Sequence, residues 1–135
     1  MNTYFPPTTH YRMRVTVGEH SVRHIRRIVR SLLAEWELAE LVDAVELGVT
    51  ELVTNVVRHV PDQRCEVVVL RTAEAGVRVE VADGAPGLPR VTADLPLEGE
   101  SGRGLLLLDA VADKWGVGGR PGEGKTVWFE CHLNG

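Results

Sequence analysis

The sequence has little of several features that mark special classes of protein. Only 2 of its 135 residues are cysteines, Cys65 and Cys131, and they form neither a disulfide framework nor a metal-ligand spacing. We expect both to be buried free thiols in a reducing compartment. The N-terminus lacks a charged start followed by an apolar stretch, and the apolar run Gly104–Val111 is too short to cross a bilayer. The sequence therefore predicts a cytoplasmic protein with no secretion signal and no membrane span.

The chain also has no net positive charge. The formal net charge is -4, and no basic run stands out that could follow a phosphate backbone, so direct binding of nucleic acid is disfavoured. What is present is an ordinary globular balance, with 44% hydrophobic and 25% charged residues. We expect a flexible arm over residues 1–10, which holds Pro6 and Pro7, and a single domain over residues 11–135.

Apolar residues recur with strand and helix periods along this domain. Strands are predicted at Tyr11–Val17, Cys65–Thr72, Val77–Ala82, Trp115–Val117 and Thr126–Leu133. Helices are predicted after Ser21, which we expect to be an N-cap, and over Glu40–Val60 and Leu105–Ala112. Because most strand connections are hairpins, this order favours an α+β fold, a mostly antiparallel sheet with helices on one face.

The predicted helix Glu40–Val60 has two distinct faces. One is apolar and carries Val42, Val45, Val49, Leu52, Val53, Val56 and Val60. The other presents Glu51, Asn55, Arg58 and His59, with Gly48 beside them. Glu51 and Asn55 are four residues apart and so are neighbours on a helix. Their oxygens suit Mg²⁺, and the carboxylate could accept a proton from a hydroxyl group; a solvated helix face is the simpler alternative.

Three glycine-containing segments could approach a ligand. Asp83–Gly84–Ala85–Pro86–Gly87 follows a strand, and its Asp could accept a hydrogen bond from an exocyclic amine. Gly102–Arg103–Gly104 leads into a helix, where free N–H groups and the helix dipole bind anions. Gly124–Lys125–Thr126 opens the last strand and lacks the upstream glycine of a P-loop. Each segment alone is weak evidence for a ligand site, and a turn or a flexible helix entry is the simpler interpretation.

In combination, these segments resemble the N, G1, G2 and G3 boxes of the GHKL ATPases. The text from Thr50 to His59 is close to the N box of the anti-sigma-factor serine kinase branch, as are Gly102–Leu105 and Gly124–Phe129. The resemblance covers about Tyr11 to Leu133. It implies the two-layer α/β sandwich of the Bergerat ATP-binding fold, with ATP and Mg²⁺ as cofactors.

The resemblance also implies roles for individual residues. Asn55 would bind Mg²⁺, Glu51 would be the catalytic base, and Asp83 would bind the adenine amino group. The remaining nucleotide contacts would come from Arg58 and His59 in support, Gly87 and Gly104 on either side of a lid, Arg103 and Leu105 near phosphate, and Thr126 near the adenine. Among the departures from the family pattern, Ala85 and Pro86 stand in the G1 box where Asp-x-Gly-x-Gly is usual.

Two functions follow from this resemblance. The first is an anti-sigma factor and serine/threonine protein kinase, which sequesters a sigma factor and phosphorylates an anti-anti-sigma (STAS) partner, and which is expected to be a homodimer. The second is an ATP-binding regulatory module without kinase activity, which the Ala85–Pro86 departure favours.

Two further interpretations remain open. A detached histidine-kinase catalytic domain would need a phosphoacceptor helix, and the surroundings of His24 match one poorly. A domain that binds no nucleotide is the fourth possibility. Apart from these, the predicted first helix carries a cluster of arginines that is either a solvated face or a surface for an acidic partner or a phosphate: Arg23, Arg26, Arg27 and Arg30.

Overall fold

The computed structural model describes residues 9–73, 75–84, 100–119 and 124–133, without the side chains of residues 19 and 100–105. Its elements follow the order β1 (His10–Thr16), α1 (Glu19–Glu35), a 3₁₀ turn η1 (Ala39–Leu41), α2 (Val42–His59), β2 (Arg64–Thr72), β3 (Gly76–Asp83), α3 (Glu100–Val111), β4 (Lys114–Gly119) and β5 (Lys125–His132). Apart from the 3₁₀ turn, this is the order that the sequence predicts.

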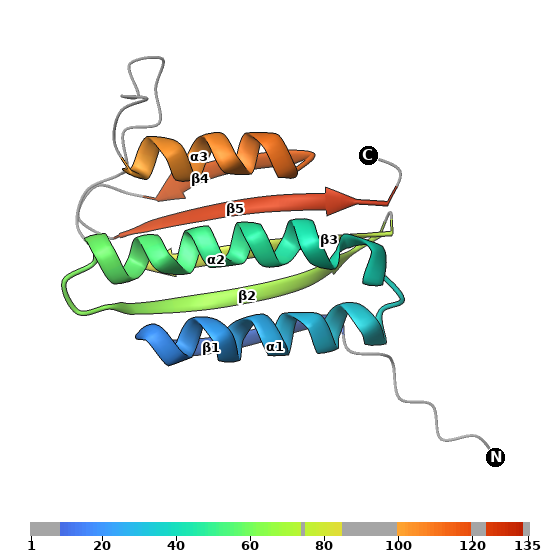
Figure 1. Cartoon of the computed structure of the whole chain (residues 1–135), viewed down its shortest axis with the longest axis horizontal. Helices are drawn as coiled ribbons and strands as arrows, with labels where there is room; N and C mark the ends of the chain where they lie inside the picture. The colour runs from blue at the N-terminus through green and yellow to red at the C-terminus, as the bar shows by residue number, and fades with distance from the viewer. Residues whose placement is uncertain (1–8, 74, 85–99, 120–123, 134–135) are drawn as a thin grey trace.

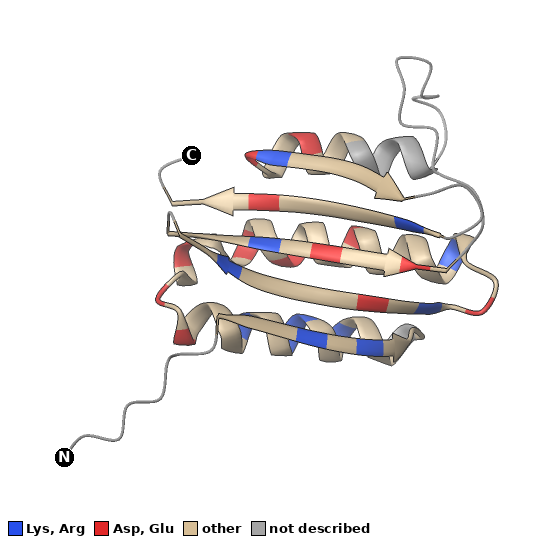
Figure 2. Cartoon of the chain, turned by 180° about the vertical axis from the view of Figure 1, so that it is seen from behind, with Lys and Arg blue, Asp and Glu red and all other residues tan. Residues whose placement is uncertain are grey.

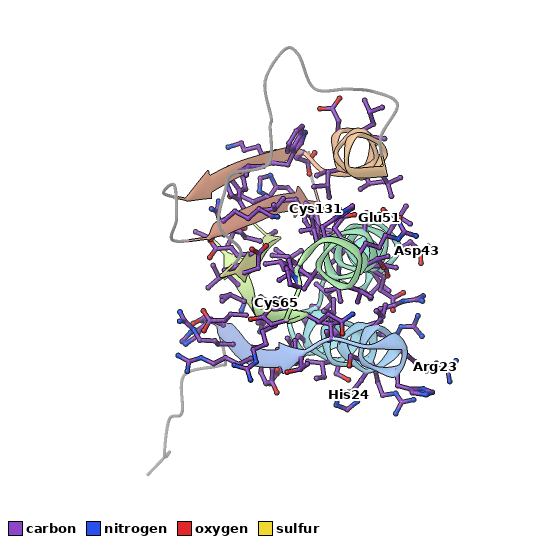
Figure 3. All side chains as sticks on the ribbon, turned by 90° about the vertical axis from the view of Figure 1, so that its left-hand side faces the viewer. Arg23, His24, Asp43, Glu51, Cys65 and Cys131 are labelled. Carbon is purple, nitrogen blue, oxygen red and sulfur yellow. The ribbon has the colours of Figure 1, made fainter. Side chains whose placement is uncertain are left out.

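The strands form one five-stranded sheet in the order β1-β2-β3-β5-β4. Every pairing between the described strands is antiparallel. Helices α1, α2 and α3 lie side by side against one face of this sheet, and the other face is left open (Figures 1 and 3). The predicted fold class, an α+β two-layer sandwich with helices on one face, is confirmed.

The core lies between the sheet and the helices. Along β3 the side chains alternate, so Val77, Val79 and Val81 are buried against the helices while Arg78 and Glu80 lie on the open face. The valine stripe predicted for the second helix is buried from Val45 to Val60. Both cysteines are buried and free, as predicted.

Helix α2 packs closely on β5 at a glycine. A Cβ added at Gly48 would lie 2.6 Å from Cζ of Phe129, whose side chain is fully buried. Gly48 precedes Glu51 by three residues and so lies beside the polar residues, as the sequence predicts, where α2 faces β5. Glycine contributes nothing to a hydrophobic pattern in the sequence. In the structure, its lack of a side chain allows α2 to approach the Phe129 ring of β5 closely.

The first helix begins earlier than predicted. Its N-cap is Gly18, and Ser21 is the third helical residue, whose Oγ accepts a hydrogen bond from the Gly18 N–H at 3.1 Å. Ser21 is therefore not the N-cap. It instead reaches back to satisfy a backbone donor at the start of the helix, as the third residue of a capping box does.

The third helix also begins earlier, at Glu100 and not at Leu105. Gly102, Arg103 and Gly104 consequently lie within its first two turns and not in a loop before it. Two glycines lower the helix propensity of this segment, which is why the sequence suggests a later start. Packing overrides that preference, since Leu108 is fully buried and α3 lies along α2.

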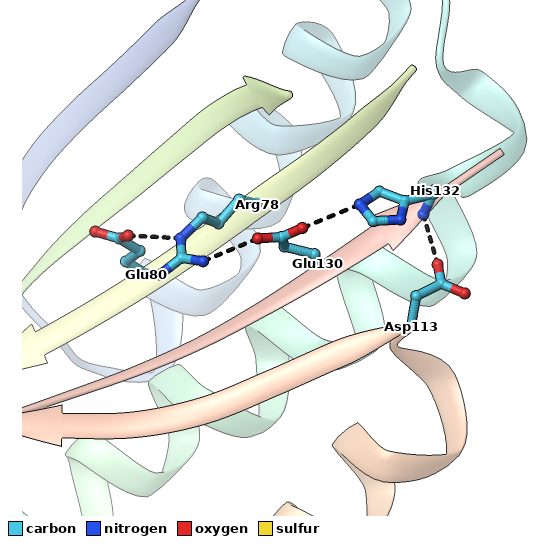
Figure 4. Close-up of polar contacts among 5 residues, drawn as sticks. All are labelled: Arg78, Glu80, Asp113, Glu130 and His132. Atoms are coloured by element: carbon cyan, nitrogen blue, oxygen red, sulfur yellow. Dashed lines mark hydrogen bonds and ion pairs between the residues drawn. The ribbon is translucent and has the colours of Figure 1, made fainter. Parts of the chain in front are cut away.

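The strands carry charged residues of both signs along their length (Figure 2). Arg78 donates to Glu80 at 2.7 Å and to Glu130 at 2.9 Å, and the Nε2 of His132 lies 3.0 Å from Glu130 (Figure 4). The backbone N–H of His132 also donates to Asp113 at 2.6 Å, which links β5 to the start of β4. The open face of the sheet is held together by a connected network of ion pairs and hydrogen bonds.

Candidate functional site

Four elements meet at one end of the domain. Helix α2 ends there at His59, β3 ends at Asp83, α3 begins at Glu100, and β5 begins at Lys125 (Figure 1). The topology makes this unavoidable, because α2 and β3 run in one direction while α3 and β5 run in the other. The structure therefore brings the polar end of α2 and the last residue of β3 to the same end of the domain.

The polar row of α2 lies where the sequence predicts it. Glu51 and Asn55 are half-buried, whereas Arg58 and His59 are exposed at the last turn. Figure 3 places Glu51 on the side of α2 nearest α3. Since Asn55 follows it by one helical turn, the pair shares this side and is partly shielded from solvent.

Asn55 carries an unsatisfied polar atom. Its Oδ1 is buried and has no hydrogen-bond partner among the described residues. A buried amide oxygen without a partner costs about 1–3 kcal/mol, so it marks a place where a donor or a cation belongs. An oxygen ligand beside the Glu51 carboxylate fits Mg²⁺.

The chain by itself offers only part of a metal site. Within the described ranges, no group of three or more His, Cys, Asp or Glu side chains is gathered for a metal ion. Mg²⁺ needs few protein ligands, because it is held by one or two side chains together with water and substrate phosphates. The donor set at Asn55 therefore fits a cation that arrives with a phosphorylated ligand.

Asp83 is a buried carboxylate at the end of an apolar strand. Its side chain is 2% exposed, and its Oδ2 lies 3.5 Å from the Nζ of Lys125. It is paired in register with Cys65 on β2. Burial, assisted by the negative charge of Asp83, raises the pKa of the Cys65 thiol to about 11. Asp83 is thus a single negative charge at the rim of the hydrophobic layer, well placed to accept a hydrogen bond from a ligand.

Lys125, which the sequence analysis did not select, is the strand residue beside Asp83. The two are Cα partners in the β3–β5 ladder, whereas Thr126 is opposite Ala82. Since neighbours along a strand point to opposite faces, Thr126 lies on the open face and Lys125 on the helix-covered face. The structure therefore does not bring Thr126 to Asp83. Only the pairing register between β3 and β5 shows that Lys125, and not Thr126, lies beside Asp83.

The chain matches a protein-family model described as the histidine kinase-like ATPase domain over residues 15–131. The chain belongs to this family. No curated protein sequence matches it significantly. As a histidine kinase-like ATPase domain of the GHKL superfamily, the protein is an ATP-binding module of the regulatory or kinase type, and Asn55 and Asp83 lie at the end of the sheet where four elements meet.

Several predicted nucleotide contacts of this ATPase domain fall outside the described residues. These are Gly87 as a whole and the side chains of Arg103 and Leu105. The backbone of α3 still places Gly102 in the first turn, where helix N–H groups have no partner within the helix, and Gly104 in the second. Among the helices of the described part of the chain, none is long and apolar enough to span a bilayer.

The arginine cluster of the ATPase domain lies away from this site, on α1. Arg30 donates to Glu46 of α2 at 2.9 Å, and Arg26 lies 3.9 Å from the same carboxylate. The hydrogen bond to Glu46 raises the pKa of the Arg30 guanidinium. These three residues, with Arg23 and Arg27, line an open hollow. Glu46, which the sequence analysis did not single out, therefore ties α1 to α2 beneath a strongly positive surface.

Proposed function

We propose that this protein is an anti-sigma factor and a serine/threonine protein kinase, which uses ATP with Mg²⁺ to phosphorylate an anti-anti-sigma partner of the STAS type. The observation that carries the proposal is the unpartnered, buried Oδ1 of Asn55, one helical turn from Glu51. The similarity of Thr50–His59 to the N box of the anti-sigma kinase branch supports it as well.

The residues divide the work of phosphoryl transfer, which depends on positioning and electrostatics more than on covalent chemistry. Asp83 would accept a hydrogen bond from the adenine amino group and so hold the base in position. Asn55 would hold Mg²⁺ through its Oδ1, and the ion would screen the charge of the phosphates. Glu51 would accept the proton of the attacking serine or threonine hydroxyl. The first turn of α3 would direct backbone N–H groups at the phosphates.

The partner surface in this proposal is the arginine face of α1. Four guanidinium groups and one carboxylate line the hollow there. Arg23 and Arg27 are exposed, and Figure 3 shows Arg23 pointing outward. Such a surface is complementary to an acidic patch on a sigma factor or a STAS protein, and charge complementarity speeds association.

The kinase is tested by phosphate transfer from labelled ATP to a purified STAS-domain protein. We expect Glu51→Gln to reduce transfer about 100-fold or more while ATP still binds, because general acid–base catalysis contributes typically 10²–10⁴-fold. Asp43→Asn is the matched control, since Asp43 is an exposed acidic residue in the first turn of the same helix. Equal transfer by wild type and Glu51→Gln would contradict the assignment of Glu51.

The partner surface has a separate test. Arg23→Glu and Arg27→Glu should weaken binding of the STAS-domain protein, and more strongly at low than at high salt, with ATP affinity unchanged. Arg30 is a poor choice for this variant because it also joins α1 to α2 through Glu46.

The alternative is a regulatory module that binds ATP and holds partners without transferring phosphate. Ala85 and Pro86 in the segment after Asp83 favour it. ATP binding with no transfer to any STAS-domain protein, and with partner affinity that changes on adding ATP, would support this alternative over the kinase.

A further inference from the structure

Lys125 and Asp83 form an ion pair at the mouth of the nucleotide site. The Nζ lies 3.5 Å from Oδ2, and the Lys125 side chain is 21% exposed against 2% for Asp83. The two residues are Cα partners across β3 and β5, so the backbone holds them side by side. The pair therefore presents a donor and an acceptor next to each other, with the donor nearer to solvent.

The backbone around this pair leaves little room for adjustment. Gly124, directly before Lys125, has a φ of +94°, and a Cβ there would collide with the carbonyl oxygen of Asp83. This contact fixes the start of β5 against the end of β3. Lys125 is thus held at one position relative to Asp83.

The surroundings argue against a purely structural pair. Asp83 and Glu46 are the charged side chains that are buried among the described residues, and the rest of the buried layer is apolar. A buried ion pair must recover the desolvation of both groups, so replacing it with apolar residues is often neutral or stabilising. We therefore attribute the ion pair between Lys125 and Asp83 to recognition of a ligand and not to stabilisation of the fold.

We propose that Lys125 and Asp83 together select the nucleobase. Asp83 accepts a hydrogen bond from the exocyclic amine, and Lys125 donates to the ring nitrogen next to that amine. An ammonium group has three donors and no acceptor, and an ionised carboxylate only accepts. This pattern matches a 6-aminopurine and mismatches a 6-oxopurine, whose oxygen would face the carboxylate. The inference rests on the proposed nucleotide site and adds Lys125 to it as a specificity residue.

The test uses calorimetry with Mg²⁺ and three nucleotides: ATP, 1-deaza-ATP and 7-deaza-ATP. The two analogues each replace one ring nitrogen beside the amine with a C–H group. We expect Lys125→Met to weaken ATP binding about tenfold, as for the loss of a charged hydrogen bond. One of the two analogues should bind the wild type as weakly as ATP binds Lys125→Met. The affinity for this analogue should not change with the substitution, because the nitrogen that accepts from Lys125 is already gone.

Controls separate this role from others. Glu130→Gln changes a charged residue of the same strand on the opposite face and should leave all three affinities unchanged. Lys125→Arg keeps a charged donor and should restore part of the preference for ATP. If Lys125→Met does not fold, Lys125→Gln takes its place, because it removes the charge with a smaller change of polarity.

The outcomes are distinct. Equal weakening of ATP and both analogues would mean that Lys125 only attracts phosphate, and no change with any nucleotide would mean that the pair is structural; either result overturns the inference. Absence of ATP binding by the wild type would instead overturn the nucleotide site itself.

Discussion

Asp83 and Glu130 are carboxylates on neighbouring strands of one sheet, and their surroundings differ completely. Asp83 lies on the helix-covered face, 2% exposed, with the Nζ of Lys125 at 3.5 Å. Glu130 lies on the open face, 17% exposed, with Arg78 at 2.9 Å and His132 at 3.0 Å. Asp83 is therefore paired with a lysine within an apolar layer, whereas Glu130 belongs to a partly exposed network of charged side chains.

The difference indicates different roles for the same chemical group. Accessible ion pairs contribute about 0–1 kcal/mol each, so the open-face network contributes modestly to stability. A buried charge is costly unless it is well paired, and such groups gather at functional sites. We therefore expect substitutions at Asp83 to change ligand binding, and substitutions at Glu130 to change only stability.

The largest effect is expected at Gly124, which sets the position of Lys125 against Asp83. Gly124→Ala should lower the free energy of unfolding by about 3 kcal/mol, since the backbone conformation is strained for alanine and its Cβ would collide with the Asp83 backbone. Gly118→Ala is the control, because nothing lies within 4 Å of a Cβ there. Urea unfolding of both variants measures the difference, and equal stability would refute the close contact.

The next effect concerns the two carboxylates directly. Asp83→Asn should weaken Mg-ATP binding about 10- to 100-fold, because a hydrogen bond to a charged group contributes about 1.5–3 kcal/mol. Glu130→Gln should leave ATP affinity unchanged. Calorimetry on both variants measures this contrast. The comparison fails if the two substitutions have the same effect on ATP binding.

A smaller effect distinguishes the packing of the two faces. Gly48→Ala on the covered face should cost about 1–2 kcal/mol, since the Phe129 ring is fully buried and cannot move away. Gly116→Ala on the open face should cost less, although its Cβ would lie 2.8 Å from the Trp128 ring, because that ring is only half-buried. Alanine gains about the same intrinsic stability over glycine at both positions. Thermal unfolding of both variants measures the two losses of stability. A larger loss for Gly116→Ala than for Gly48→Ala would contradict the tighter packing of the covered face.

The smallest effect is the pH dependence of the open-face network. Burial alone would raise the pKa of Glu130, but the hydrogen bonds from Arg78 and His132 together lower it below its ordinary value of 4.5. Glu130 therefore contributes stability that is complete above pH 4.5 and is lost as the pH falls through the lowered value. The stability difference between wild type and Glu130→Gln should shrink between about pH 5 and pH 3. A difference that stays constant over this range would argue against the network.

Much of the fold follows from the sequence because its periodic patterns are strong. The valine stripe of α2 is confirmed as a buried face, and β3 forms where the run Val77–Ala82 predicts a strand. The start of α3 could not be predicted, because packing at Leu108 overrides the low helix propensity of Gly102 and Gly104.

The candidate site is only partly readable from the sequence. The position of Asn55 and Glu51 on one side of a helix follows from their spacing, and their assignment to a nucleotide site follows from the resemblance of the combined segments to the family's boxes. Lys125 follows from neither, because its position beside Asp83 depends on the register between β3 and β5, and a shift of one residue would have put Thr126 there instead. Long-range pairing of this kind leaves no local signal.

Calorimetric titration of Mg-ATP into the wild type and Asn55→Ala tests whether the ends of α2 and β3 form the nucleotide site. We expect binding by the wild type that is lost in Asn55→Ala, without a decrease in the free energy of unfolding of more than about 1 kcal/mol, since the replaced oxygen has no partner within the described chain. Binding of equal strength by both proteins, or no binding by the wild type, would contradict the claim that the ends of α2 and β3 form the nucleotide site.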